Sequence, residues 1–123
     1  MAAPNLSSPT TITGKTTYLD LTSTSETDLL TNSASSGKAL RVTFISLCNV
    51  DGTAEVDATV KIYTAASGGT GYEIVSTMTV PADATVTPLG RDLSLWLEED
   101  RRLTVTTSAA NDLVVVCSYE EVA

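Results

Sequence analysis

The chain has 123 residues, of which 42% are hydrophobic and 18% charged, and its formal net charge is -8. A chain of this length forms one domain and buries a core without help from a metal or a disulfide. The acidic balance removes the counterion release that drives most nucleic-acid binding, so we expect no direct contact with DNA or RNA and no attachment to an anionic membrane.

The N-terminal segment is rich in Ser, Thr and Pro and has almost no large apolar side chain. Such a segment buries little surface by itself. We interpret residues 1–17 as an extended N-terminal arm that becomes ordered against a neighbouring subunit, with a frayed terminus as the alternative, and residues 18–123 as the folded domain. The candidate contact residues of the arm are Pro4, Leu6, Pro9 and Ile12.

Alternating apolar and polar side chains predict the strands that follow. The first is at 18–22, and polar turns and a Ser-rich loop separate it from a long strand at 39–49. The second half of that strand is apolar on both sides, so we expect it to be covered on both faces. Further strands are predicted at 55–64, 72–80, 84–89, 93–97, 103–108 and 113–120. About eight short strands indicate an all-β fold, an antiparallel β-sandwich of jelly-roll or immunoglobulin-like type.

Turn residues stand between the predicted strands. Gly68-Gly69-Thr70-Gly71 is typical of a permissive hairpin loop, because no strand-to-helix transition follows it as in phosphate-binding loops. Gly90-Arg91-Asp92 predicts a second turn. Residues 98–102 are charged and too short for a helix between strands, so a turn is expected there as well.

Chemically reactive groups are scarce in this sequence. There is no histidine, which removes the commonest general base. Cys48 and Cys117 lie in apolar strand patterns and are interpreted as core residues, although a disulfide between them is possible if their strands are neighbours. We therefore predict a protein that is not an enzyme, with no cofactor and no metal.

Two acidic groups are candidate cation sites. Asp51, Glu55 and Asp57 have ligand-like spacing but lack the rest of a calcium loop. The second group is Glu98, Glu99 and Asp100, followed by Arg101 and Arg102. We interpret it as a solvated charge cluster at a hairpin tip, with a hard cation as the alternative.

Trp96 has the opposite strand phase to Leu95 and Leu97. If those leucines face the core, the indole faces outward, where tryptophan often anchors protein interfaces. A one-residue bulge that returns the indole to the core is the alternative.

Several turn and strand motifs occur in a distinctive order along the chain. They are Cys48–Thr53, Val80–Ala84, Leu97–Leu103, Ser108–Leu113 and Cys117–Glu120. In this order the chain, from about Thr11 onward, resembles small virion proteins of tailed bacteriophages, especially marine and cyanobacterial phages. The resemblance implies a β-sandwich decoration, or cement, protein that sits on capsids as an oligomer, and it carries over no catalytic residue.

The resemblance and the residues together predict a virion structural protein, in the first place a capsid decoration protein that binds the outer surface of the phage head and bridges capsomers. Its expected partners are the major capsid protein or other virion proteins, and copies of itself in a dimer or trimer. It would be made in the host cytoplasm and reside on the capsid surface. The expected contacts are the arm residues with Trp96, Glu98, Glu99, Arg101 and Arg102.

Two other functions stay open at this point. A neck, tail or fibre subunit of the same virion would have the same kind of sequence. A carbohydrate-binding module is also possible on a sandwich, but sugar sites usually present aromatic platforms, and this chain is only 5% aromatic.

Overall fold

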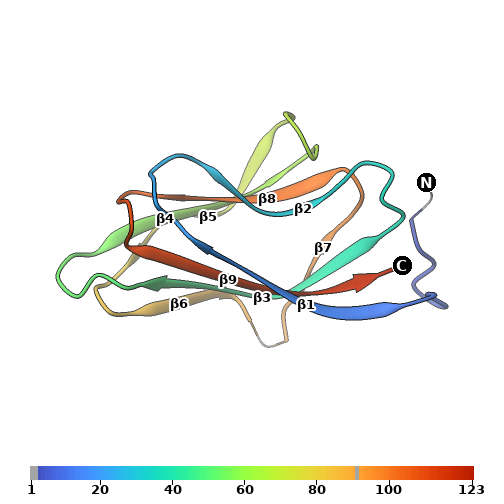
Figure 1. Cartoon of the computed structure of the whole chain (residues 1–123), viewed down its shortest axis with the longest axis horizontal. Helices are drawn as coiled ribbons and strands as arrows, with labels where there is room; N and C mark the ends of the chain where they lie inside the picture. The colour runs from blue at the N-terminus through green and yellow to red at the C-terminus, as the bar shows by residue number, and fades with distance from the viewer. Residues whose placement is uncertain (1–2, 91) are drawn as a thin grey trace.

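The computed structural model describes residues 3–90 and 92–123, which fold into two antiparallel sheets packed face to face (Figure 1). The strands are β1 (Ile12–Asp20), β2 (Thr27–Asn32), β3 (Ala39–Asn49), β4 (Val56–Tyr63), β5 (Gly71–Val80), β6 (Thr85–Leu89), β7 (Leu95–Leu97), β8 (Arg101–Thr107) and β9 (Leu113–Val122). No helix in this part of the chain has the length and apolar character that crossing a membrane requires.

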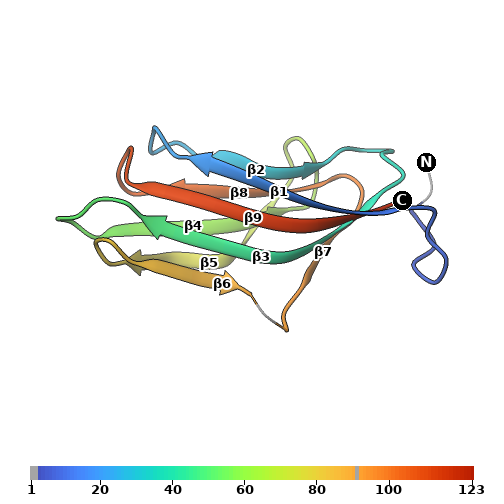
Figure 2. The same cartoon turned by 60° about the horizontal axis from the view of Figure 1, so that its bottom comes forward.

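The strand order identifies the type of sandwich. One sheet runs β1-β9-β3-β6, with β7 also paired to β3, and the other runs β2-β8-β4-β5; Figure 2 shows the first sheet in front. The pairs are nested: β4 pairs with β5, β3 with β6 and β7, β2 with β8, and β1 with β9. One long antiparallel ribbon rolled into two layers is a jelly roll. The predicted all-β sandwich is confirmed, and this order selects the jelly roll over the immunoglobulin-like alternative.

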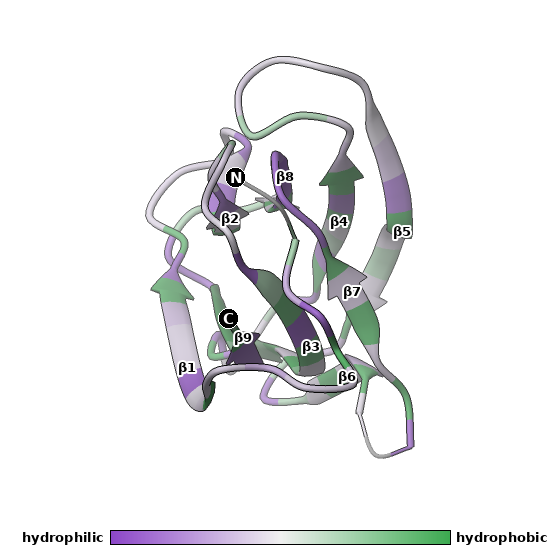
Figure 3. Ribbon diagram, turned by 90° about the vertical axis from the view of Figure 1, so that its right-hand side faces the viewer, coloured by the Kyte–Doolittle hydropathy of each residue, from purple (hydrophilic) through white to green (hydrophobic). Residues whose placement is uncertain are grey.

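Side chains alternate between the core and the outer faces, as the pleat of a strand requires. In β9, Val115 and Cys117 are fully buried, whereas Val114 and Val116 lie half-buried on the outer side. Figure 3 views the two layers end-on. The largest fully buried side chains between them are Ile45, Leu47, Leu97, Leu103, Leu113, Val42, Val56, Val60, Val80, Val105 and Val115.

Most strands lie where the sequence placed them, and β3 has the predicted bounds. Two elements differ. The first strand begins at Ile12 rather than at residue 18, because β9 is ten residues long and pairs with it as far as Val122. The expected arm therefore ends in the sheet, with its last residues at the sheet edge. A separate strand, β2, occupies Thr27–Asn32, where the sequence predicts the end of a polar turn, two leucines and the start of a Ser-rich loop but no strand.

The cysteines lie on adjacent strands but on opposite faces. Cys117 is buried in the core opposite Ile45, whereas Cys48 is half-buried on the outer side of β3, and both are free thiols. Burial raises the pKa of the Cys117 thiol to about 12. The disulfide that the sequence left open is not formed.

The turns agree with the sequence patterns. Gly68 and Gly69 both adopt positive φ in the β4–β5 loop, which explains the glycines there. Residues 99–100 form a bend, not a helix, before β8 begins. The predicted turn at 90–92 includes Arg91, which lies outside the described residues; beside it, the Leu93 N–H donates to the Gly90 carbonyl at 3.0 Å.

Candidate interaction surfaces

The outer face of the five-stranded sheet carries exposed apolar side chains among polar ones. Val115 and Cys117 point into the core, so Val116, which lies between them in β9, points outward. The residues that pair with Val116 on β1 and β3 point to the same outer side. The register places Tyr18 beside Val116 and sets Cys48 beside Val114. No layer of the described chain lies on this face, so the expectation that β3 would be covered on both faces is wrong for the single chain.

Two sequence-predicted contact residues lie toward one end of this outer face, on strands that β9 and β3 separate. Trp96 on β7 lies beside Arg41, and Ile12 on β1 lies beside Val122. Trp96 is 43% exposed and Ile12 is 60% exposed, whereas Leu97 is fully buried. The indole therefore faces outward as its phase predicted, and no bulge returns it to the core.

The outer face of the four-stranded sheet is polar along β4 and β8. The core-facing residues of these strands include Val60, Val105 and Leu103, so the positions between them lie on the outer side, where Thr104 is nevertheless only 1% exposed. The outward pairs on β4 and β8 are Thr59 with Thr106, Lys61 with Thr104, and Tyr63 with Arg102. The outer face of the five-stranded sheet, where Ile12, Tyr18 and Trp96 are exposed, is the better candidate for contact with another protein.

The sequence predicted that Arg102 is a solvated charge at a hairpin tip, and this prediction is wrong, because its side chain is only 12% exposed. Its guanidinium lies 3.8 Å from the centroid of the Tyr63 ring. It also donates to the carbonyls of Ala65 and Gly68 at 2.7 and 2.8 Å and pairs with Asp28 at 3.3 Å. Arg102 therefore fixes the β4–β5 loop, a role that sequence spacing could not reveal.

Arg101 supports the same loop. It donates to the carbonyl of Thr64 at 3.0 Å and to that of Asp100 at 2.9 Å. A carboxylate oxygen of Asp100 in turn accepts the N–H of Ala66 at 2.9 Å. Glu98 is exposed and pairs with Arg101 at 3.4 Å, and Glu99 is half-buried. Of the predicted charge cluster, Glu98 is the most exposed member.

Glu26 holds together the outer surface of the four-stranded sheet. Its carboxylate accepts hydrogen bonds from the hydroxyls of Thr104 at 2.7 Å and Tyr63 at 2.7 to 2.8 Å. The Thr104 bond, followed by the Tyr63 bond, lowers the pKa of Glu26, and the Glu26 bond raises the pKa of Tyr63. This cluster ties the chain before β2 to β4 and β8.

Glu121 plays a similar part near the end of β9. It pairs with Lys15 at 3.0 Å and with Lys38 at 3.1 Å, so it joins β1 to the chain before β3. The hydrogen bond from Lys15 lowers the pKa of Glu121 first, followed by the bond from Lys38, and the same contact raises the pKa of Lys15. Exposed pairs of this kind orient strands more than they stabilise them.

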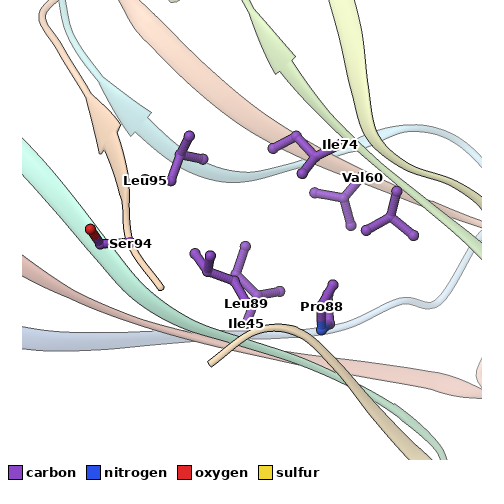
Figure 4. A pocket seen from close by; sticks show the side chains of 8 residues that line it. Ile45, Val60, Ile74, Pro88, Leu89, Ser94 and Leu95 are labelled. Carbon is purple, nitrogen blue, oxygen red and sulfur yellow. The ribbon is translucent and has the colours of Figure 1, made fainter. Parts of the chain in front are cut away.

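An apolar cleft opens between the two sheets beside β5 and β6 (Figure 4). Its volume is about 380 Å³, including the part open to solvent. It is lined by Ile45, Val60, Ile74, Val75, Pro88, Leu89, Ser94 and Leu95. A lining with one hydroxyl and no titratable group suits an apolar side chain rather than a reacting substrate.

The acidic groups do not gather into a cation site in the described structure. No group of three or more His, Cys, Asp or Glu side chains is placed to hold a metal in residues 3–90 and 92–123. Asp51 instead accepts hydrogen bonds from the N–H and hydroxyl of Thr53 at 3.0 and 2.9 Å. It thereby closes the turn that follows β3.

The segment before β1 lies against the last residue of the chain. The N–H groups of Thr10 and Thr11 donate to the Ala123 carbonyl at 2.7 and 3.1 Å. Before these bonds, Leu6 is 54% exposed, while Pro4 and Pro9 are half-buried. Residues 3–9 therefore carry apolar side chains outside the sheets.

Comparison with known proteins was informative only at the level of the fold. No protein-family model and no curated protein matches the sequence. A chain from Bacillus endospore appendages, described as a novel family of disulfide-linked pili, aligns with a TM-score of 0.54 and 17% identity over 92% of this chain and 88% of that one. A chain from the acid-stable capsid structure of Helicobacter pylori bacteriophage KHP30 aligns with a TM-score of 0.54 and 11% identity, over 94% and 90%.

Both likenesses extend over nearly the whole of each chain. At these identities they show a shared fold. The jelly roll found here therefore occurs, at full length, in a chain of a phage capsid structure and in a chain of a bacterial pilus structure.

Proposed function

We propose that this chain is a virion structural protein, a decoration protein that binds the outer surface of a phage head and bridges its capsomers. The observation that carries the proposal is the exposure of Trp96 and Ile12 on the outer face of the five-stranded sheet. Exposed tryptophan is a common anchor of protein interfaces. The apolar residues before β1 extend the same contact.

The fold is in keeping with this role. A jelly roll of the same extent is present in the capsid structure of a Helicobacter pylori phage. The one cleft described above has an apolar lining, which fits a docking scaffold. On a shell, many equivalent copies multiply weak contacts through effective concentration, so each copy needs only modest affinity.

The test is binding to purified phage heads assembled without this protein. Trp96→Ala should weaken binding at least about tenfold, because a large interface anchor is removed. Tyr72→Ala is the matched control, since Tyr72 is 62% exposed and lies on β5 of the other sheet; its binding should be unchanged. Deletion of residues 2–9 should also weaken binding, and it spares the bonds of Thr10 and Thr11 to Ala123.

Thermal unfolding of each isolated variant separates binding from folding. If Trp96→Ala binds shells normally, the outer face is not the contact. If it instead loses about 3 kcal/mol of stability, the size expected for truncating a core side chain, the indole serves the fold. A neck, tail or fibre station would appear as about a dozen or fewer copies per particle, where a decoration protein is present in far larger number.

A further inference from the structure

The edges of the two sheets are protected unequally against pairing with another chain. Native proteins protect edge strands with prolines, bulges or short length. β6 contains Pro88, and β7 rather than β6 pairs with the first residues of β3. β2 has only six residues and a register shift. β5 has two register shifts and a positive φ at Thr77. β1 has nine residues, no proline and no register shift against β9.

The free backbone groups of β1 can be assigned from its bonds to β9. Thr11 and Ala123 exchange two hydrogen bonds at 3.0 and 3.1 Å, and the Leu21 N–H donates to the Leu113 carbonyl. Bonded and non-bonded positions alternate in an antiparallel pair, so odd-numbered residues face β9. The N–H and C=O groups of the even-numbered residues face away from β9, where the described chain places no strand (Figure 3). These exposed residues are Ile12, Gly14, Thr16, Tyr18 and Asp20.

We propose that β1 pairs antiparallel with β1 of a second copy, centred on Thr16, and joins the two five-stranded sheets into one. In this register Thr16 bonds to Thr16 of the second copy, and Gly14 bonds to Tyr18 of the second copy. All nine residues of each strand overlap, and every bonded position is an even-numbered residue with outward-facing groups. The proposal goes beyond shell binding and does not depend on it.

The side chains of β1 complement one another in this register. Gly14 has no neighbouring atom within 4 Å of its Cβ position, and Tyr18 is 75% exposed. Pairing lays each tyrosine ring over the glycine of the second copy, an arrangement that stabilises glycine in sheet edges. The same arrangement occurs within the chain, where a Cβ on Gly71 would lie 2.7 Å from the ring of its cross-strand partner Tyr63.

Charge also favours a second copy at this edge. The chain has a net charge of -8, so two copies repel each other over most approaches. β1 contains one cation, Lys15, and one anion, Asp20, and is neutral overall. The register centred on Thr16 sets Lys15 opposite Thr17 of the second copy, whereas a register centred on Lys15 would oppose the two lysines.

The decisive variant is Thr16→Pro. Proline removes the outward N–H and clashes with an added strand, yet it is tolerated at an edge position whose N–H does not serve the sheet. Sedimentation over about a hundredfold range of concentration should show a dimer for the native chain and a dissociation constant at least about tenfold higher for the variant. Thr16→Val is the matched control: it also loses the 2.9 Å contact with the Ser118 hydroxyl but keeps the N–H, and it should dimerise normally.

A second variant covers the case in which Thr16→Pro disturbs folding, which circular dichroism would reveal. Tyr18→Ala removes the ring that covers Gly14 and should weaken the dimer, whereas Tyr72→Ala, on β5, should not. Amide exchange at Gly14, Thr16 and Tyr18 should slow as protein concentration rises, while Thr31 on the β2 edge exchanges at a constant rate.

Two results would overturn the proposal: a native chain that stays monomeric over the whole concentration range, or a folded Thr16→Pro variant that dimerises like the native chain. Shell binding is measured separately. A monomeric Thr16→Pro variant that still adds to heads would leave the proposed function intact, and a dimer that ignores heads would leave this inference intact.

Discussion

Asn49 shows how a polar residue can organise a core. It is fully buried at the end of β3. Its side-chain amide donates to the carbonyls of Ala54 and Val80 at 2.9 and 3.0 Å, and its side-chain oxygen accepts the Asp51 N–H at 3.0 Å. These bonds connect the end of one sheet with the turn that follows and with the end of β5.

Asn49→Ala should therefore destabilise the chain by about 2–4 kcal/mol, because two buried carbonyls lose their donor. Urea unfolding followed by circular dichroism measures the change. Asn5→Ala, at an exposed residue that accepts one backbone N–H, is the control and should stay within about 0.5 kcal/mol of the native chain. Equal losses for the two variants would contradict this role of Asn49.

Residues differ in how well the sequence foretold their place. The phase of Trp96 against Leu95 and Leu97 depends on three adjacent positions, so its outward orientation was predictable. The roles of Arg101 and Arg102 were not, since their acceptors are loop carbonyls more than thirty positions away in sequence. Only the β4–β8 register brings these groups together.

At the scale of the element, β5 is an irregular edge strand. It changes register twice against β4, and Thr77 adopts a φ of 47°. A β-branched side chain in this left-handed region is strained. The Thr77 N–H nevertheless finds an acceptor, the Thr59 hydroxyl, at 3.1 Å. The strain accompanies a bulge that keeps this edge from pairing.

Thr77→Asn should stabilise the chain by about 0.5–1 kcal/mol, because asparagine tolerates positive φ and the backbone bond to Thr59 is kept. Thermal unfolding measures the gain. Ser76→Asn is the matched control, at the exposed neighbour whose φ is not positive, and it should give no gain. A loss of stability on Thr77→Asn would show that the threonine side chain makes a contribution larger than its strain.

The strands were predictable where alternation is strong, as in β4, whose two-residue period follows one buried face, and where a long apolar run marks a strand, as in β3. β2 was missed because a bulge at Asp28 to Leu30 breaks its alternation. The first half of β1 was missed for another reason. Its residues are exposed on both faces, so they show no apolar period, and only the presence of β9 makes them a strand.

At the scale of the whole molecule, net charge governs how copies meet. With a charge of -8, the long-range interaction between two chains is repulsive, and salt screens it. The proposed contact at β1 consists of backbone bonds between strands that have no net charge, and salt affects such bonds little.

The dimer should therefore become tighter as NaCl is raised from about 20 mM to about 500 mM, since screening removes repulsion without breaking the contact. Sedimentation equilibrium at both concentrations gives the two dissociation constants. The Thr16→Pro variant is the control and should remain monomeric in both. A dimer that weakens with salt would point to ion pairs across the contact and against the neutral β1 edge.

The nesting of strand pairs has a consequence for how this chain reaches its native state. Only β4 and β5 meet across a short loop, and each further pair encloses all the pairs inside it, up to Ile12 beside Val122. Loop closure between such distant residues is entropically slow, and folds of this kind take milliseconds to seconds. β1, the edge strand without a second neighbour in the native sheet, is thus also expected to be the last strand to pair, with β9, during folding.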